Sequence, residues 1–475
     1  ITYTGNSGGT LSGLTRGANG TTAAIHSSGA TVTDAADFFS WNAAASGDIV
    51  TAPGLWSLDN FGNKLIATIF GAETFEWDSD PIGANNTRAT ILANAPTASS
   101  FTLVSAPDRH LIFFGTETTV GTSSSRDEMF IRFSDQESID ATTSYAPSAI
   151  NTAGTQRLAD GSKIVGAIRG RDAIYIWTDT SLFIMRFVGA PFTFSFQQVG
   201  TNCGLIGKNA AVEVDGSAYW MSENGFFRYT GKLESLPCLV EDHVYDDINT
   251  IPKQHINAGL NNLFGEVMWF YPNSGANTVN RMVCYNYLDS TPERPVWTTG
   301  TLARSAWQDS AVFGKPHASE YDTSSNGTSG SATFVQGNTD GVSYYYEHET
   351  GLDQIREGAT SSITANIQSG DFDIGAQGGL AGAGNDGEFM MKIRRVLPDF
   401  LSQTGDTRIT LNLRDFPNQT QASSTLGPFT ISSSTNKVDT RARARSISLK
   451  VDNTSTSQFW KLGTFRLDIQ PDGRR

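Results

Sequence analysis

The feature that most constrains this chain is a recurring run of short apolar strands, each run separated by tight turns and centred on an aromatic residue. In residues 210–230, three β-forming stretches are joined through Asp215-Gly216 and Asn224-Gly225. Asp-Gly between β-formers favours a two-residue type I′ turn, since both central residues take positive φ. Asn224-Gly225 repeats the signal in what we expect to be a longer loop. The segment therefore predicts a three-stranded meander.

The same succession of short apolar strands and tight turns occurs upstream, in residues 163–187. In both meanders a Trp on the middle strand is followed six residues later by a Phe, Trp177 with Phe183 and Trp220 with Phe226. This match predicts an internal repeat, and looser copies follow the same plan at 64–77, 101–133, 256–288 and, more weakly, up to Ser343-Tyr-Tyr-Tyr.

The middle strands are centred near residues 67, 112, 175, 219, 268 and 344. Propeller blades repeat at about 40–50 residues, so this spacing predicts a β-propeller of about six blades over residues 51–357. A lone meander cannot bury both of its faces, and a closed ring supplies each blade with a neighbour. A pair of β-sandwiches is the alternative that the same strands could build.

The pattern changes from about residue 358. Stretches such as those at 390–396, 407–413, 446–451 and 464–469 alternate apolar and polar residues, as in a sheet with one wet face. They predict a C-terminal β-sandwich over 358–475. A small N-terminal β module or insertion is expected over 1–50, so the fold class is all-β throughout.

Charge is unevenly divided along the chain. Residues 388–475 hold 14 Lys and Arg against 8 Asp and Glu, and the whole chain holds 34 against 48, which leaves 20 against 40 for residues 1–387. An acidic body repels phosphates, so ordinary DNA binding by a basic surface is disfavoured for most of the molecule. No run of 18 apolar residues occurs, so we expect no membrane partner.

The motifs that could carry chemistry are weak. Cys203, Cys238 and Cys284 are odd in number and far apart, which predicts buried thiols. The acidic stretch Glu241 to Asp247 is more typical of a solvated turn than of a metal site. Gly382 to Gly387 is a single copy of half a calcium-binding repeat and predicts a loop. We therefore expect no catalytic residue, no metal site and no cofactor.

The C-terminal segment carries a family resemblance. Arg441-Ala-Arg443-Ala-Arg445 is followed by Ser-Ile-Ser-Leu-Lys-Val, by Phe459-Trp-Lys-Leu-Gly463, by Phe465-Arg-Leu-Asp468 and by a closing Gly473-Arg474-Arg475. This run resembles the end of tail nozzle proteins of short-tailed bacteriophages, also called packaged-DNA stabilization proteins.

Other parts of the chain share the likeness, which spans residues 55–475. Gly204-Leu-Ile-Gly207, Ala218-Tyr-Trp-Met-Ser-Glu-Asn-Gly-Phe-Phe and Pro237 to Asn249 resemble the family's central propeller. Tyr3 to Val32 is similar to a module met in phage tail proteins. The chain departs from the family at its start, where the usual N-terminal region is not seen.

The resemblance implies a structural virion protein without enzymatic activity. Its members form a hexameric ring below the portal and adaptor, where the ring serves as a conduit that retains packaged double-stranded DNA and releases it at infection. The implied partners are other copies of the chain, the head-to-tail adaptor and tail fibre proteins, with DNA passing through without sequence recognition.

A docking surface is expected at the basic C-terminus. Arg441, Arg443 and Arg445 alternate along a predicted strand and should project to one face, with Arg474 and Arg475 at the end of the chain as further candidates. A solvated strand face is the plainer interpretation of the same pattern. Two other function classes stay open: a receptor- or glycan-binding tail adhesin, and a propeller glycosidase with paired carboxylates.

Overall fold

The computed structural model describes residues 5–7, 10–12, 56–78, 89–105, 108–311, 313–322, 342–356, 358–374, 380–381, 389–416 and 422–473. They belong to two compact units, Ile1–Gly327 with Gly337–Tyr346, and Thr328–Gln336 with Glu347–Arg475. The described part is almost all β, which confirms the predicted all-β class. No helix in these ranges is long and apolar enough to cross a membrane.

Six antiparallel sheets follow one another along the first unit, and in each the strands are hydrogen-bonded in chain order. The first two are β3 (Trp56–Phe61), β4 (Lys64–Ile69), β5 (Thr74–Asp78) and β6 (Thr90–Ile91), then β7 (Phe101–Ser105), β8 (His110–Phe114), β9 (Phe130–Phe133) and β10 (Gly154–Arg157). The next two are β11 (Ile164–Arg169), β12 (Ile174–Thr178), β13 (Ser181–Gly189) and β14 (Thr193–Thr201), then β15 (Ala211–Val214), β16 (Ser217–Ser222), β17 (Gly225–Tyr229) and β18 (Leu233–Leu236).

The last two sheets of the unit are β19 (Asn257–Asn261), β20 (Glu266–Tyr271), β21 (Arg281–Asn286) and β22 (Trp297–Gly300), then the three-stranded β23 (Ala306–Gln308), β24 (His317–Asp322) and β25 (Val342–Glu347). The short helices are η3 (Ser123–Ser125), α1 (Glu241–Tyr245) and η4 (Lys253–His255). At the start of the chain, β1 (Gly5–Ser7) pairs with β2 (Thr10–Ser12), whereas the rest of the predicted module at 1–50 lies outside the described residues.

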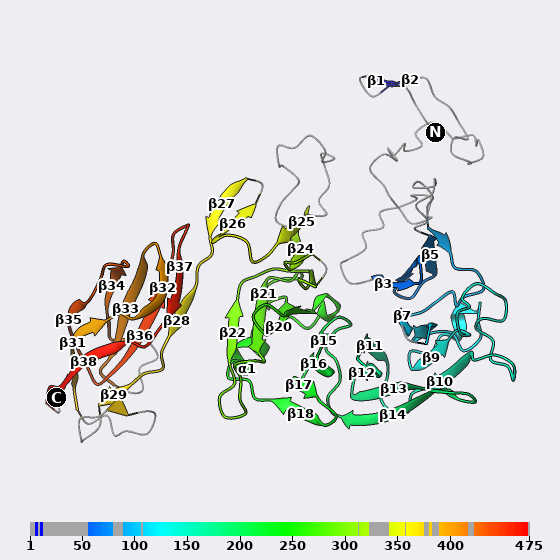
Figure 1. Cartoon of the computed structure of the whole chain (residues 1–475), viewed down its shortest axis with the longest axis horizontal. Coiled ribbons are helices and arrows are strands. Elements are labelled where there is room, and N and C mark those ends of the chain that lie inside the picture. Colours follow the sequence, from blue (N-terminus) through cyan, green and yellow to red (C-terminus); the bar gives the residue numbers. More distant parts are fainter. Residues whose placement is uncertain are drawn as a thin grey trace. The chain divides into compact units, whose positions relative to one another are not determined.

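The first strands of successive sheets contact one another in order, from β3 through β7, β11, β15 and β19 to β23. Figure 1 shows β7, β11 and β15 on the inside of an arc of sheets, and β10, β14, β18 and β22 on its outside. Meanders arranged with their first strands inward are the architecture of a propeller, so the first unit is β-propeller-like.

Apolar side chains between neighbouring sheets form the core of this unit. One cluster joins three sheets through the fully buried Trp177, Trp220 and Trp269. Two of these indoles donate a hydrogen bond backwards along the chain, Trp220 to the Cys203 carbonyl at 2.8 Å and Trp269 to the Ala210 carbonyl at 3.0 Å. The predicted role of aromatic residues in packing neighbouring sheets together is confirmed.

Of the two connections predicted in residues 210–230, the structure confirms the first and corrects the second. Asp215 and Gly216 both have positive φ, at 49° and 85°, as a type I′ turn requires. Ser222 pairs directly with Gly225, so the second connection is also a two-residue turn and the longer loop was wrong.

The Trp-to-Phe spacing does not mark equivalent positions. Trp177 pairs with Leu182, whereas Trp220 pairs with Phe227. The rings of Trp177 and Trp220 lie 5.3 Å apart, so they meet from opposite sides of one interface. The last predicted middle strand also differs, because Ser343 to Tyr346 lies in β25, the third strand of its sheet.

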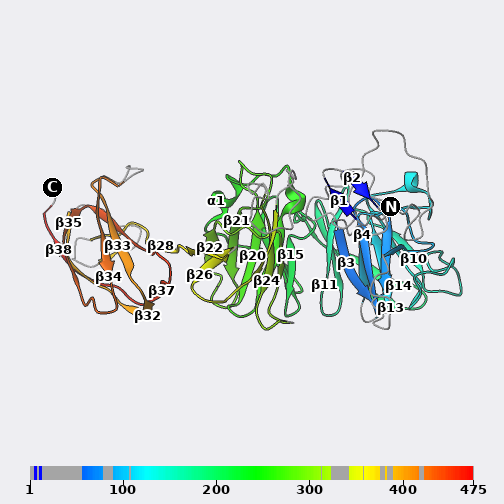
Figure 2. The same cartoon turned by 90° about the horizontal axis from the view of Figure 1, so that it is seen from above.

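The second unit is built from two main sheets that share one core. One contains β28 (Asn366–Gln368), β36 (Ser446–Asp452), β33 (Thr407–Arg414) and β34 (Ser424–Ile431); the other contains β35 (Val438–Ala444), β31 (Met391–Leu397) and β38 (Arg466–Pro471). Alternate residues of β33 and β35 are buried in that core, as the predicted pattern requires. Figure 2 shows β33 with β34 in one layer and β35 with β38 in another.

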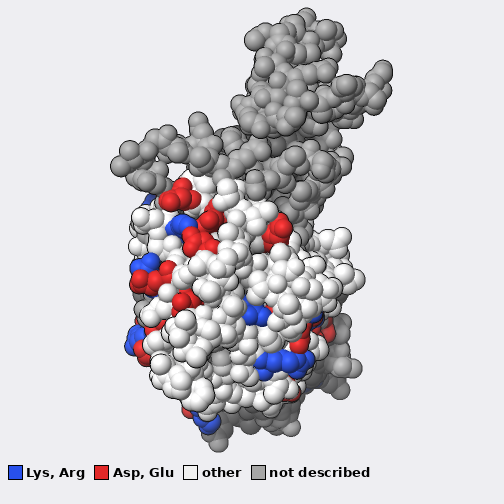
Figure 3. Space-filling model, turned by 90° about the vertical axis from the view of Figure 1, so that its right-hand side faces the viewer, with Lys and Arg blue, Asp and Glu red and all other residues white. Residues whose placement is uncertain are grey.

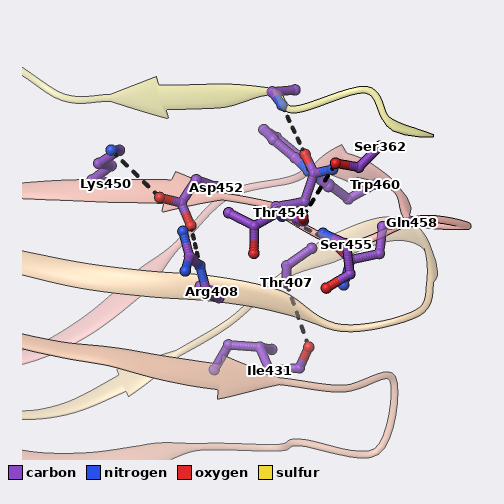
Figure 4. A network of polar contacts seen from close by, with 12 residues as sticks. Ser362, Thr407, Arg408, Ile431, Lys450, Asp452, Thr454, Ser455, Gln458 and Trp460 are labelled. Carbon is purple, nitrogen blue, oxygen red and sulfur yellow. Dashed lines mark hydrogen bonds and ion pairs between the residues drawn. The ribbon is translucent and has the colours of Figure 1, made fainter. Parts of the chain in front are cut away.

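Three smaller strand pairs complete the second unit: β26 (Asp353–Arg356) with β27 (Ala359–Ser362), β29 (Asp373–Ile374) with β30 (Leu380–Ala381), and β32 (Phe400–Thr404) with β37 (Phe459–Leu462). Polar contacts hold β26 and β27 to this unit. Ser362 donates to the Thr454 carbonyl (Figure 4). The backbone N–H of Ser457 donates to the Asp353 carboxylate at 2.8 Å. The division between units falls after Tyr346, so β26, which the sequence assigned to the 51–357 region, lies with β27 in the second unit.

Candidate functional site: the cationic face of sheet β35-β31-β38

The predicted arginine row lies on the edge strand β35. Its residues alternate strictly between buried and exposed, because Val438, Ala442 and Ala444 enter the shared core. Arg441 and Arg443 therefore project from the outer face, as predicted.

Arg445 was wrongly placed in that row. The strand ends at Ala444 and β36 starts at Ser446, so Arg445 occupies the one-residue connection. Its backbone N–H donates to the Arg414 carbonyl at 3.1 Å, and its side chain is half-buried. Arg474 and Arg475 lie outside the described residues.

The two neighbouring strands add more cations to this face. In the register of the sheet, Lys392 of β31 lies between Arg443 and Gln470, and Arg395 lies between Asp439 and Asp468. A bulge between Ile393 and Arg395 leaves Arg394 as an extra, exposed residue. We call the outer surface of β35, β31 and β38 the cationic face; its charged members are Lys392, Arg394, Arg395, Lys437, Asp439, Arg441, Arg443, Arg466, Asp468 and Asp472.

Part of this charge is neutralised locally. Asp439 accepts from Arg395 at 2.8 Å and lies 3.0 Å from Lys437, and Arg443 Nε lies 2.6 Å from the Asp472 carboxylate. The hydrogen bond from Arg395, supported by Lys437, holds the pKa of Asp439 below its usual value.

The remaining cations are available to a partner. Among the described residues no ion pair engages Lys392, Arg394, Arg441 or Arg466. Guanidinium groups on a rigid sheet bind carboxylates or phosphates with two parallel hydrogen bonds each, so the face suits an acidic surface. The sequence contained this signal, since Lys-Ile-Arg-Arg in β31 was predicted as a strand but was not combined with the arginine row.

The other predicted candidates do not converge on a site. Glu241 to Tyr245 form the short helix α1, and Asp247 interacts with Arg281 at 3.4 Å and with Ser274. No cluster of metal-ligating side chains occurs within the described ranges. Gly382 to Gly387 lie outside them.

The cysteines are free and unreactive in character. Cys203 and Cys284 are buried, whereas Cys238 is half-exposed, which corrects its predicted burial. Burial raises the pKa of Cys203 and of Cys238 to about 11, so both thiols stay protonated at neutral pH.

The acidic side chains of the first unit are mixed with basic ones on at least one face of the molecule. On the face of the molecule in Figure 3, acidic and basic side chains are interspersed. Several carboxylates form local ion pairs, as Asp127 does with Arg157 and Glu223 with Lys253. The net acidity of the unit is therefore a sum over many sites and not one patch on this face.

Comparisons with known proteins found similarity among solved structures only. No family model matches the chain, and the search of curated proteins found no match. Among solved structures, the chain is similar to the AfRom2 CNH domain at 11% identity over 56% of this chain and 77% of that one, with a TM-score of 0.35. It is similar to BamB from Moraxella catarrhalis at 12% identity over 56% and 79%, with a TM-score of 0.29.

A third similar structure is the dihydro-heme d1 dehydrogenase NirN in complex with DHE, at 9% identity over 55% of this chain and 49% of that one, with a TM-score of 0.34. Likenesses with TM-scores this low carry no argument about function. The propeller-like description rests on the sheets of this chain itself.

Proposed function

We propose that this chain is a structural subunit of a virion, the distal tail nozzle of a short-tailed bacteriophage. In this proposal several copies form a ring, joined to a head-to-tail adaptor and to tail fibre proteins. The ring retains packaged double-stranded DNA and lets it pass at infection, without catalysis. The resemblance of residues 55–475 to that family motivates the proposal, and hexameric stoichiometry comes from the resemblance alone.

The observation that carries the proposal is the unneutralised charge of the cationic face. Lys392, Arg394 and Arg441 project from a sheet whose inner side packs in the core, so their backbone positions are fixed before any partner binds. Pre-organised cations lose less conformational entropy on docking than cations on a loop. A second copy of this chain supplies an acidic partner, because its residues 1–387 carry 20 Lys and Arg against 40 Asp and Glu.

The finer architecture fits such a subunit. We interpret the six successive sheets of the first unit as six propeller blades and the two layers of the second unit as a β-sandwich. Both are rigid scaffolds that place loops and faces at fixed positions, as a wall-forming protein requires.

The acidic surplus of residues 1–387 suggests how DNA would pass through the ring. A basic wall would bind the polymer at many phosphates, with an affinity that falls steeply with salt. An acidic wall would repel it and let it slide. We propose that a share of the acidic surplus of residues 1–387 faces the conduit.

The experiment removes charge from the cationic face without touching its ion pairs. A variant with Lys392→Gln, Arg394→Gln and Arg441→Gln is compared with a control that loses the same charge at exposed positions elsewhere, Arg171→Gln, Lys232→Gln and Lys461→Gln. Sedimentation at low salt should show assembled species for the native chain and the control, and monomer for the first variant. Equal assembly of all three proteins would exclude the cationic face as the docking surface.

A further inference from the structure

The second sheet of the first unit carries a pocket with a cavity volume of about 280 Å³. Three connections form its walls: the segment between β6 and β7, the loop between β8 and β9, and the loop between β9 and β10. The residues on which the argument depends are Asn94, Thr118, Thr119, Arg132, Thr142 and Tyr145.

Arg132, in the middle of β9, is only 4% exposed and lines this pocket. Its Nη1 donates to the Tyr145 carbonyl at 2.8 Å, and its Nη2 donates to the Thr118 carbonyl at 2.8 Å and to the Glu117 carbonyl at 3.3 Å. One guanidinium therefore holds two of the three connections that line the pocket.

These contacts leave Arg132 with unused capacity. A guanidinium has five N–H donors, and the Nε–H of Arg132 is buried without a partner. No described carboxylate forms an ion pair with it. Burial lowers the pKa of Arg132, and the charge of Glu117 opposes that effect.

The Glu117 carboxylate is itself committed elsewhere. It accepts hydrogen bonds from the backbone N–H groups of Thr97, Gly121 and Thr122, and from the Thr97 hydroxyl. Glu117 therefore compensates Arg132 only at a distance. A buried cation without a directly bonded anion is unfavourable, and a bound anion would offset that cost.

The rest of the lining suits the oxygens of a small organic acid. Thr119 and Thr142 are exposed at the pocket and offer hydroxyls. The Thr118 hydroxyl donates to the Ser125 carbonyl and the Asn94 amide N–H donates to the Asp140 carbonyl, so these two residues offer their side-chain oxygens as acceptors. Val120 and Ala146 supply apolar surface beside them. Hydroxyls and an amide around a cation recognise a polyol that carries a negative charge.

We propose that this pocket binds a small carboxylate-bearing polyol, of the size of a monosaccharide acid. The volume lies just below the range of about 300–1,000 Å³ that is typical of pockets for larger ligands. A bare inorganic anion would leave most of the space unfilled. The proposal is independent of the nozzle function, because the pocket and the cationic face belong to different units.

The test is calorimetric titration of the full chain with D-glucuronate, with D-glucose and inorganic phosphate as comparison ligands. Glucuronate should bind, and glucose and phosphate should bind at least about tenfold more weakly, because one lacks the charge and the other the size. Absence of glucuronate binding at millimolar concentration, or equal binding of either comparison ligand, would overturn the assignment.

Two variants locate the binding. Ala146→Trp fills the pocket from an exposed position and should abolish glucuronate binding, whereas Ala141→Trp, exposed in the same loop but outside the lining, should leave it unchanged. Thr142→Val removes one hydroxyl and should weaken binding about threefold to tenfold. These variants avoid Arg132, whose replacement would release both loops. Glucuronate binding that survives Ala146→Trp would place the ligand elsewhere and refute the proposal.

Discussion

The carboxylate of Asp59 in β3 lies 3.1 Å from the guanidinium of Arg169 in β11, and its second oxygen accepts a 2.7 Å hydrogen bond from the backbone N–H of Val104 in β7. Arg169 also donates to the Val104 carbonyl at 3.3 Å. One nearly buried carboxylate thus connects the first strands of three successive sheets. This contact therefore joins the first three of the six sheets to one another.

Asp59→Ala should therefore destabilise the first unit by about 2–3 kcal/mol, because it leaves the Val104 N–H unsatisfied and removes a charge-assisted bond. Asp172→Ala removes an exposed carboxylate three residues after the end of β11 at Arg169. This variant is the matched control and should change the free energy of unfolding by less than about 0.5 kcal/mol. Urea denaturation of both variants measures the difference. Equal effects would show that Asp59 has no special role.

Two buried tryptophans differ in one hydrogen bond. The Trp269 indole donates to the Ala210 carbonyl, whereas the Trp177 Nε1 is buried without a partner, and both side chains are fully buried. Trp269→Phe should cost about 1 kcal/mol more than Trp177→Phe, because only the first removes a hydrogen bond, while the Ala210 carbonyl still accepts from the Met221 N–H at 3.1 Å. Thermal unfolding of the two variants gives the comparison, and a larger loss for Trp177→Phe would contradict it.

Asp452 predicts an acid sensitivity of the second unit. Burial alone would raise its pKa, but hydrogen bonds from Arg408 at 2.6 Å and from Lys450 outweigh that effect and hold the pKa below its usual value (Figure 4). Stability from this depressed pKa is present above the unfolded value of about 3.9 and is lost as the pH falls through the lower folded value.

The measurement is amide hydrogen exchange of β33 and β36 at neutral and acidic pH. Asp452→Asn should lower their protection at pH 7 and reduce the loss of protection below about pH 4. Asp439→Asn, which removes an exposed carboxylate of the cationic face, is the control and should leave these strands unchanged. An unaltered acid response in Asp452→Asn would exclude this carboxylate as its source.

His110 predicts a second pH dependence in the first unit. Its ring is fully buried among Phe133, Phe187 and Phe194, and its Nδ1 lies 2.7 Å from the Ser134 carbonyl. Burial lowers the pKa of His110, against the opposing effects of that hydrogen bond, Asp108 and Asp135. The neutral ring is thus the folded form, so stability should be complete above about pH 6.5 and fall as the pH decreases below it.

Unfolding in urea between pH 8 and pH 5 tests this dependence. His110→Asn should retain a donor to Ser134 and show a shallower decrease in stability below about pH 6.5, whatever its stability at pH 8. An identical slope for the native chain and the variant would assign the dependence to other groups.

The sequence was most informative where a residue pattern determines local geometry. Second strands such as β12 and β16 were predicted because aromatic and branched residues occupy both of their faces. Fourth strands such as β14 were missed, since their side chains are mostly exposed and show no apolar period. The order of strands along the chain does not predict the hydrogen bond from the Trp269 indole to the Ala210 carbonyl, because that contact depends on how two sheets pack together.

The candidate site was predicted in part for the same reason. Alternation along β35 correctly placed Arg441 and Arg443 outward, but nothing in the sequence marked Ala444 as the end of the strand, so Arg445 was misplaced. The bulge at Arg394 and the facing strand β38 are products of tertiary pairing. Arg132 in an otherwise apolar strand was a visible sign of a buried cation, although the loops that it holds were not predictable.

Class averages of the purified chain by electron microscopy, recorded at low salt, test the nozzle proposal most directly. The account predicts closed rings that disappear when Lys392, Arg394 and Arg441 are replaced by Gln and persist in the charge-matched control. Monomers without rings for the native chain, at every protein concentration and salt concentration tried, would contradict it.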